Sequence, residues 1–104
     1  MIRYKVIASD VADQDLIEIG RYIASQFSSP MTALKMMNTI EEALLELSNM
    51  PHRCSLVDDE HLSAMGYRKI YIKNYTAFFT IDDKSMIVNI ERVLYTRRDW
   101  VHIL

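Results

Sequence analysis

The sequence predicts an α+β domain in which an N-terminal strand and an antiparallel helical hairpin precede a three-stranded antiparallel meander. Residues 10–50 repeat apolar side chains at the spacing of three or four that is typical of helices. Residues 66–104 instead contain three strand-like runs separated by short polar turns. The chain has 104 residues, half of them apolar, which suits a single globular domain, and we expect that domain to span 1–104.

Residues 3–8 are predicted to form a short strand, because Tyr4, Val6 and Ala8 fall on one side of an extended chain. Ser9 and Asp10 follow, and their side-chain oxygens are suited to cap the first turn of a helix. The apolar stripe of that helix consists of Ala12, Leu16, Ile19, Ile23 and Phe27. This spacing predicts a helix with one buried face.

A second helix is predicted to begin at Pro30, with Ser29 as its N-cap, since proline is well tolerated at the first helical position. Its stripe consists of Ala33, Met37, Ile40, Leu44 and Leu47, and Pro51 marks its end. The short link between the helices predicts an antiparallel hairpin. Residues 52–65 show no periodicity and are predicted to form a loop, in which the single cysteine, Cys54, would be a surface thiol.

Three strands are predicted at 67–73, 75–81 and 86–95, with turns at Asn74 and at 82–85. A meander of this size does not fold alone, so we expect one face of it to pack on the helical hairpin. The N-terminal strand is expected to join the sheet at an edge or beside the last strand.

The charge is unevenly distributed along the chain. Residues 1–65 carry five basic and ten acidic side chains, whereas residues 66–104 carry seven basic and four acidic ones. A net charge of +3 on an acidic body is a weak anchor for nucleic acid, although it suits a local site. No secretory signal or membrane span is evident, so we expect a cytoplasmic protein that does not enter a membrane.

Two common types of site are not indicated by the sequence. Only two glycines are present, Gly20 and Gly66, which excludes a glycine-rich phosphate loop. His52, His61 and His102 lack the spacing of metal ligands. We therefore expect neither a metal nor another cofactor.

Arg68 and Arg92 each share a predicted strand face with apolar residues. These neighbours are Ile70 and Ile72 for Arg68, and Val88, Ile90 and Leu94 for Arg92, with Glu91 on the opposite face. A guanidinium on such a face must be paired, reach the rim or bind an anion. Two interpretations are open for both residues: a clamp by a helix carboxylate, or a site for phosphate or an acidic partner.

The end of the chain concentrates Tyr95, Arg97, Arg98, Trp100 and His102. In an RNA-cleaving enzyme, arginines would stabilise the charged transition state, and a tyrosine or histidine would move protons. In a recognition surface, the same residue types dominate binding energy. The residues alone leave both possibilities open.

Several segments of the chain resemble, in order, the RelE/ParE superfamily of bacterial toxins. They are Ala12-x-x-Asp15-Leu16-x-x-Ile19-x-x-Tyr22-Ile23, Met50-Pro51, Gly66-Tyr67-Arg68-Lys69, Asn74-Tyr75, Phe78-Phe79 and Arg92-Val93-Leu94-Tyr95-x-Arg97-Arg98-Asp99. The resemblance covers nearly the whole chain. It implies a growth-arresting toxin of a type II toxin–antitoxin module, silenced in a hetero-oligomer by a cognate antitoxin whose C-terminal segment wraps the toxin.

The superfamily contains two mechanisms, so whether the protein is an enzyme depends on the branch. RelE-like members cleave mRNA on the ribosome, and the resemblance would make Arg68, Arg98 and Tyr95 catalytic, with His102 as a further acid/base candidate. Two departures count against this branch: no lysine pair precedes Gly66, and Leu104 stands where RelE has a terminal tyrosine.

ParE-like members instead inhibit DNA gyrase by binding, and the segments around Gly66 and at 92–95 are closer to that branch. The predicted surface for target or antitoxin then comprises Arg68, Arg92, Tyr95, Arg97, Arg98 and Trp100. A third possibility is a module that has lost toxicity and binds only its antitoxin.

Overall fold

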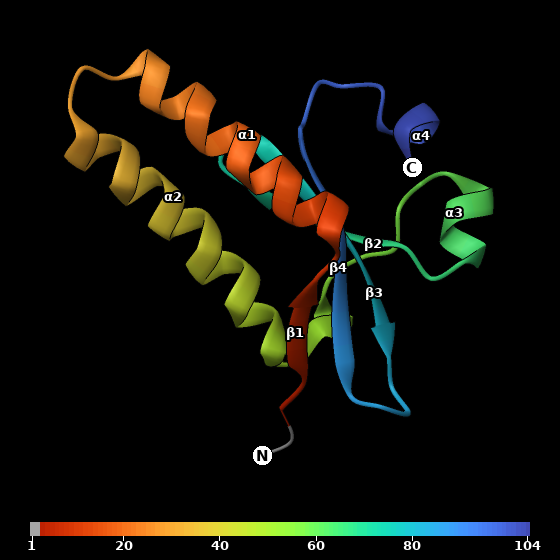
Figure 1. Ribbon diagram of the computed structural model, residues 1–104. Helices are drawn as coiled ribbons and strands as arrows, with labels where there is room; N and C mark the ends of the chain where they lie inside the picture. The colour runs from red at the N-terminus through yellow and green to blue at the C-terminus, as the bar shows by residue number, and fades with distance from the viewer. Residues whose placement is uncertain (1–2) are drawn as a thin grey trace.

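The computed structural model describes residues 3–104, which contain one four-stranded sheet (Figure 1). Its strands are β1 (Lys5–Ala8), β2 (Arg68–Ile72), β3 (Tyr75–Asp82) and β4 (Ile87–Tyr95). Strands β2, β3 and β4 form the predicted antiparallel meander, and β1 lies at the edge, parallel to β4. Both expectations for the N-terminal strand are thus confirmed.

The helical hairpin consists of α1 (Asp10–Gln26) and α2 (Pro30–Leu45). Ser9 caps α1, since its Oγ accepts a hydrogen bond from the N–H of Ala12 at 3.0 Å. The side chain of Ser29 makes no such bond to α2. Of the two predicted features at the start of α2, only Pro30 at the first helical position is present. Figure 1 shows the two helices running side by side in opposite directions, as predicted.

The prediction of an irregular loop at 52–65 is wrong in part. After the short 3-10 helix η1 (Glu46–Ser48), the chain forms a second one, η2 (Pro51–Arg53), and then α3 (Glu60–Ala64). The acidic run begins α3, because Asp59 Oδ2 accepts from the N–H of Leu62 at 3.0 Å. Cys54 is not a surface thiol but is 9% exposed.

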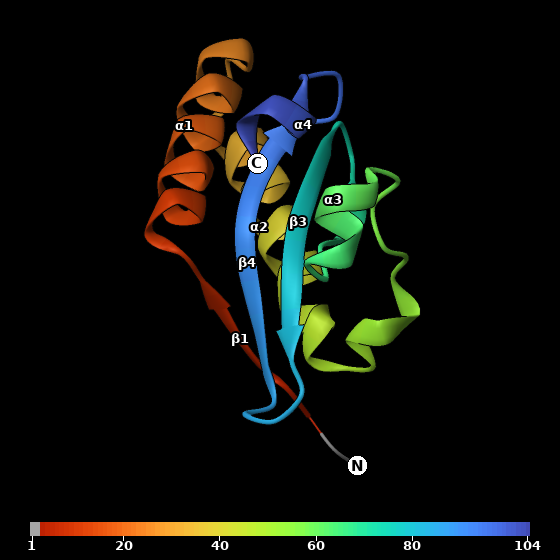
Figure 2. The same cartoon turned by 90° about the vertical axis from the view of Figure 1, so that its right-hand side faces the viewer.

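Both faces of the sheet are covered. The helical hairpin packs on one face, and the larger core lies between them, around the buried side chains of Ile19, Ile40, Ala77, Phe79 and Val93. On the other face, Phe78 and Leu94 are covered by α3 and by the C-terminal helix α4 (Trp100–Ile103). Figure 2 shows α3 and α4 on this second face.

A β-bulge in β4 changes which side chains share a face. Phe78 pairs with Arg92, but Phe79 pairs with Ile90, so Glu91 is an extra residue. Val88 and Ile90 therefore face the hairpin, whereas Arg92 and Leu94 lie on the other face with Phe78.

The bulge overturns part of the predicted alternation. Arg92 does not share its face with Val88 and Ile90. Glu91 is not opposite Arg92 either, because its carboxylate accepts a hydrogen bond from Thr80, which lies on the same face of β3 as Phe78.

No helix within residues 3–104 is both long enough and apolar enough to cross a membrane.

Candidate functional site

The candidate site lies where the outer edge of β4 meets α1. Strand β1 ends at Ala8, opposite Ile90, so no strand within residues 3–104 lies beside the rest of β4 on that side. The N-terminal part of α1 covers the next stretch of the edge instead. Ser9 donates through its N–H to the carbonyl of Ile90 at 3.0 Å and through its Oγ to the carbonyl of Glu91 at 3.1 Å.

Arg92 is held by a carboxylate of α1. Its Nε and Nη2 donate to the two oxygens of Asp15 at 2.8 and 2.9 Å, and Asp15 also accepts from the N–H of Val93 at 3.0 Å. These bonds to Asp15, helped by the charge of Glu18, raise the pKa of Arg92. Of the two interpretations of Arg92, the structure shows the helix-carboxylate clamp.

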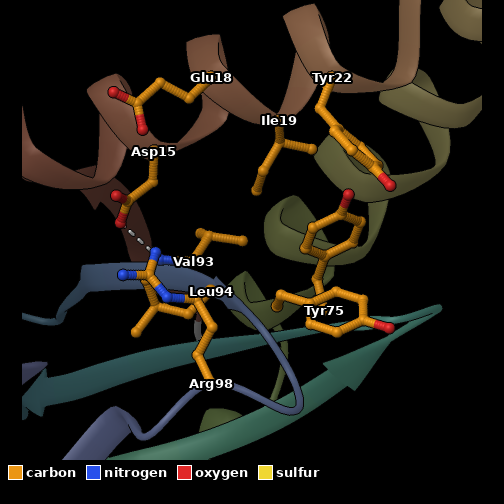
Figure 3. Close-up of a pocket in the computed structure, with 9 residues that line it drawn as sticks. Asp15, Glu18, Ile19, Tyr22, Tyr75, Val93, Leu94 and Arg98 are labelled. Carbon is orange, nitrogen blue, oxygen red and sulfur yellow. Dashed lines mark hydrogen bonds between the residues drawn. The ribbon is translucent and has the colours of Figure 1, made fainter. Parts of the chain in front are cut away.

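A cleft of about 330 Å³ opens beyond this clamp, between α1 and the end of β4. It is lined by Asp15, Glu18, Ile19, Tyr22, Tyr75, Val93, Leu94, Tyr95 and Arg98, and we call it the tyrosine cleft. Figure 3 shows the carboxylates of Asp15 and Glu18 and the side chain of Arg98 toward one end, with Tyr22 and Tyr75 toward the other.

The tyrosines make the cleft mainly aromatic at one end. The rings of Tyr75 and Tyr95 meet edge to face, with centroids 6.1 Å apart. Burial is the main reason that the pKa of Tyr75 is raised. Its hydroxyl is therefore a protonated hydrogen-bond donor at neutral pH.

A basic surface adjoins the tyrosine cleft on the far side of Tyr95. Tyr71, Lys73, Asn74, Tyr95, Thr96 and Arg97 line a shallow depression there. The side chains of Arg97 and Arg98 are exposed, and within residues 3–104 neither forms an ion pair. Tyr95, Arg97 and Arg98 are thus brought together, as expected from their closeness in sequence.

Trp100 lies on the second face of the sheet. Its ring packs on Phe78, with centroids 5.0 Å apart, in the cluster beneath α4. The ring of Trp100 is therefore partly buried in this cluster. Its role in binding a target or antitoxin stays a prediction. His102 is exposed and hydrogen-bonds the nearby Asp99 at 2.6 Å.

Arg68 lies apart from the other site residues. Its Nη1 donates to the carbonyls of Cys54 at 2.6 Å and His52 at 3.4 Å. Arg68 pairs with Phe79 whereas Tyr95 pairs with Tyr75, and four residues along a strand correspond to roughly 13 Å. The structure does not bring Arg68 together with Arg98 and Tyr95.

Sequence reasoning did not assign four polar or aromatic residues of the tyrosine cleft to a site, namely Asp15, Glu18, Tyr22 and Tyr75. Asp15, Glu18 and Tyr22 follow one another at the spacing of a helix face, beside the apolar stripe of α1. That pattern is a readable signal of a polar and aromatic helix face. Tyr75 gave none, because tyrosine is common in strands.

A second polar cluster lies at the opposite end of the sheet. The Tyr4 hydroxyl donates to Asp83 Oδ1 at 2.6 Å, and His52 Nε2 lies 3.1 Å from the same carboxylate. The bond from Tyr4 is the main cause that lowers the pKa of Asp83. No group of three or more His, Cys, Asp or Glu side chains in the described part of the chain is arranged to hold a metal.

Comparison with solved structures identifies the fold. The chain is similar to a structure of the chromosomal ParDE system of P. aeruginosa, with a TM-score of 0.74 and 18% identity over 93% of this chain and 100% of that one. It is also similar to a structure of the RelBE2 toxin–antitoxin complex of Mycobacterium tuberculosis, with a TM-score of 0.63 and 23% identity over 90% and 99%. A free mutant of the E. coli toxin RelE gives a TM-score of 0.65 at 13% identity, over 97% and 92%.

Comparison of the sequence with models of protein families identifies the family of the chain. No curated protein sequence gives a significant match. The family described as "ParE toxin of type II toxin-antitoxin system, parDE" matches residues 6–100, which include both helices of the hairpin and the whole meander. The chain therefore belongs to the ParE toxin family of type II toxin–antitoxin systems.

Proposed function

We propose that this ParE-family toxin inhibits bacterial growth by binding DNA gyrase in the cytoplasm, and that a cognate antitoxin silences it in a hetero-oligomer. We favour a binding mechanism over RNA cleavage because Arg68 lies apart from Arg98 and Tyr95. A ribonuclease centre built from these three residues would need them around one phosphate, because transition-state stabilisation acts at hydrogen-bond range.

The charges beside Arg98 also favour recognition over RNA cleavage. The carboxylates of Asp15 and Glu18 line the same cleft as Arg98. Arg92 is already committed to Asp15 by two hydrogen bonds, so it is not free to bind a phosphate. A phosphodiester placed at Arg98 would meet the carboxylate of Glu18, which forms no ion pair within residues 3–104 and opposes its negative charge.

The surface itself has the composition of a protein-binding site. Tyr95 is 44% exposed, and Arg97 and Arg98 are exposed beside it. Tyrosine and arginine are enriched at the residues that dominate protein–protein binding. We therefore assign target recognition to Tyr95, Arg97 and Arg98.

Induced expression in a bacterium tests the proposal. We expect DNA synthesis to fall before protein synthesis in pulse labelling, and the purified protein to inhibit supercoiling by gyrase. Early loss of protein synthesis, with cleaved mRNA on ribosomes, would support the RelE-like alternative instead. Normal growth with soluble protein would leave only the antitoxin-binding module.

A pair of variants links the result to the surface. Arg98→Ala should relieve growth inhibition and weaken gyrase inhibition at least tenfold. Lys84→Ala removes the same charge from the exposed turn between β3 and β4, at the other end of the sheet, and should remain toxic. Equal killing by both variants would remove Arg98 from the site.

A further inference from the structure

The backbone of β4 has an unfilled hydrogen-bonding position in the tyrosine cleft. Thr96 donates its N–H to the carbonyl of Asn74 at 2.9 Å, which fixes the phase of the ladder between β3 and β4. The N–H and C=O of Leu94 therefore face β3, and those of Val93 and Tyr95 face away from it. The bond from Val93 N–H to Asp15 agrees with this phase.

The side chains of Ser9, the N-cap of α1, and of Asp15 within α1 occupy the position just before it. In a parallel ladder, the N–H of one residue of the added strand donates to a carbonyl of the existing strand. The C=O of the same added residue accepts from the N–H that lies two residues further along the existing strand. Beyond the end of β1, Ser9 Oγ donates to the carbonyl of Glu91, and Asp15 accepts from the N–H of Val93. Together these side chains replace one residue of a continued β1.

The next position is empty. It consists of the carbonyl of Val93 and the N–H of Tyr95, and neither group has a hydrogen-bond partner within residues 3–104. Val93 and Tyr95 both line the tyrosine cleft, so the two groups border a space of about 330 Å³. Backbone groups of this kind bind water until a better partner replaces it.

We propose that an extended segment of the antitoxin places the N–H and C=O of one residue in this position, parallel to β4, and inserts an adjoining side chain between the tyrosines. Its N–H would donate to Val93 and its C=O would accept from Tyr95. The enclosing α1 and the size of the cleft limit the insertion to about one residue. Tyr22, Tyr75 and Tyr95 favour a side chain with an apolar or aromatic body. The identity of the partner rests on the proposed function.

A proline substitution isolates the backbone contribution of Tyr95. Tyr95→Pro removes the N–H and the ring, whereas Tyr95→Ala removes only the ring. Proline is tolerated at a strand edge when its missing N–H faces outward, as it does here. We expect Tyr95→Pro to bind the antitoxin at least tenfold more weakly than Tyr95→Ala, measured by calorimetry with both variants folded. Equal affinities would overturn the proposal.

Amide exchange in the wild-type toxin gives a second measurement that needs no substitution. We expect the Tyr95 amide to exchange at least tenfold more slowly in the antitoxin complex than in the free toxin, as followed by NMR. Unchanged exchange in a stable complex would overturn the insertion while leaving the proposed function intact. Protection by gyrase but not by antitoxin would overturn the assignment of the occupant. If the cognate antitoxin does not bind, both the proposed partner and the insertion fail.

Discussion

At the scale of single residues, Asp15 is the side chain that joins the helical hairpin to the edge of the sheet. Its carboxylate is almost buried and accepts three hydrogen bonds, two from Arg92 and one from the N–H of Val93. These groups lie 77 and 78 residues away in sequence. Asp15 thereby neutralises a cation and satisfies a strand edge at once.

Replacing Asp15 by Asn should lower the free energy of unfolding by about 3 kcal/mol, because it leaves Arg92 partly buried without a counter-charge. Chemical denaturation of the two proteins measures this difference. Asp13→Asn, an exposed position in the first turn of α1, serves as control and should change stability by less than about 0.5 kcal/mol. Similar losses in both variants would contradict a specific role for the clamp.

The pKa of Asp83 gives a pH-dependent prediction for the second polar cluster. A carboxyl whose pKa is lowered by folding stabilises the protein above its ordinary pKa of 3.8, and this contribution is lost as pH falls through the folded value. Tyr4→Phe removes the main cause of the shift. We therefore expect the Asp83 carboxyl to titrate at a higher pH in that variant.

Carbon NMR of the Asp83 carboxyl measures the titration directly. The stability difference between wild type and Tyr4→Phe should be present at neutral pH and shrink in acid, once the carboxyl is protonated in both proteins. Asp82, its neighbour in the same turn, serves as an internal reference. An unchanged Asp83 titration would show that the Tyr4 bond is not the cause.

At the scale of elements, the parts with a repeated pattern could be predicted and the short ones could not. The hairpin, the meander and the edge position of β1 follow from apolar periodicity and turn residues. Helices α3 and α4 have five and four residues, too few for a period to show. The bulge was missed because the predicted faces of β4 assume strict alternation from one residue to the next. No feature of the sequence indicates that Glu91 is an extra residue in the ladder.

The same reasoning explains which parts of the site could be predicted. Tyr95, Arg97 and Arg98 are close in sequence, so a strand and a turn suffice to bring them together. The link between Arg92 and Asp15, and the isolation of Arg68, depend on strand register and on contacts between distant segments.

Helix α4 is predicted to depend on Trp100 for its attachment. Trp100→Ala should destabilise the protein by about 2–3 kcal/mol, below the usual cost for a fully buried ring, because the ring is only partly covered. Thermal unfolding and the near-ultraviolet circular dichroism of the aromatic residues report the change.

A control for this variant is available within the same helix. Val101 is 39% exposed, so Val101→Ala should have little effect. Trp100→Phe should restore most of the lost stability, since a phenyl ring also packs on Phe78. Loss of gyrase inhibition by Trp100→Phe with full stability would instead place Trp100 in the binding surface.

At the scale of the whole molecule, the arginines at the two ends of the sheet have different surroundings. Arg98 and Arg97 are exposed at the end where β4 finishes, beside the tyrosine cleft. Arg68 is turned toward backbone carbonyls next to η2. We infer that the first end recognises partners and that Arg68 fixes the chain leading from η2 to β2.

Arg68→Ala and Arg98→Ala should therefore have opposite effects. Arg68→Ala should lower stability by about 1–3 kcal/mol, because the carbonyl of Cys54 loses its donor, while growth inhibition per folded molecule is retained. Arg98→Ala should keep stability and lose inhibition. Denaturation curves and growth assays at matched soluble levels separate the two, and loss of inhibition in a stable Arg68→Ala protein would restore Arg68 to the working surface.

The bulge at Glu91 also determines how this chain can diverge from its relatives. Before it, even-numbered residues of β4 point toward the hairpin; after it, odd-numbered ones do. A toxin that lost this one residue would pair Arg92 and Ile90 with Phe78 and Phe79 in an unbroken ladder, so its counterpart of Arg92 would keep the face that it has here. Loss of Glu91 alone should thus leave the other side chains of β4 on their present faces, whereas loss of a second residue beside it would turn every later side chain of β4 to the opposite face.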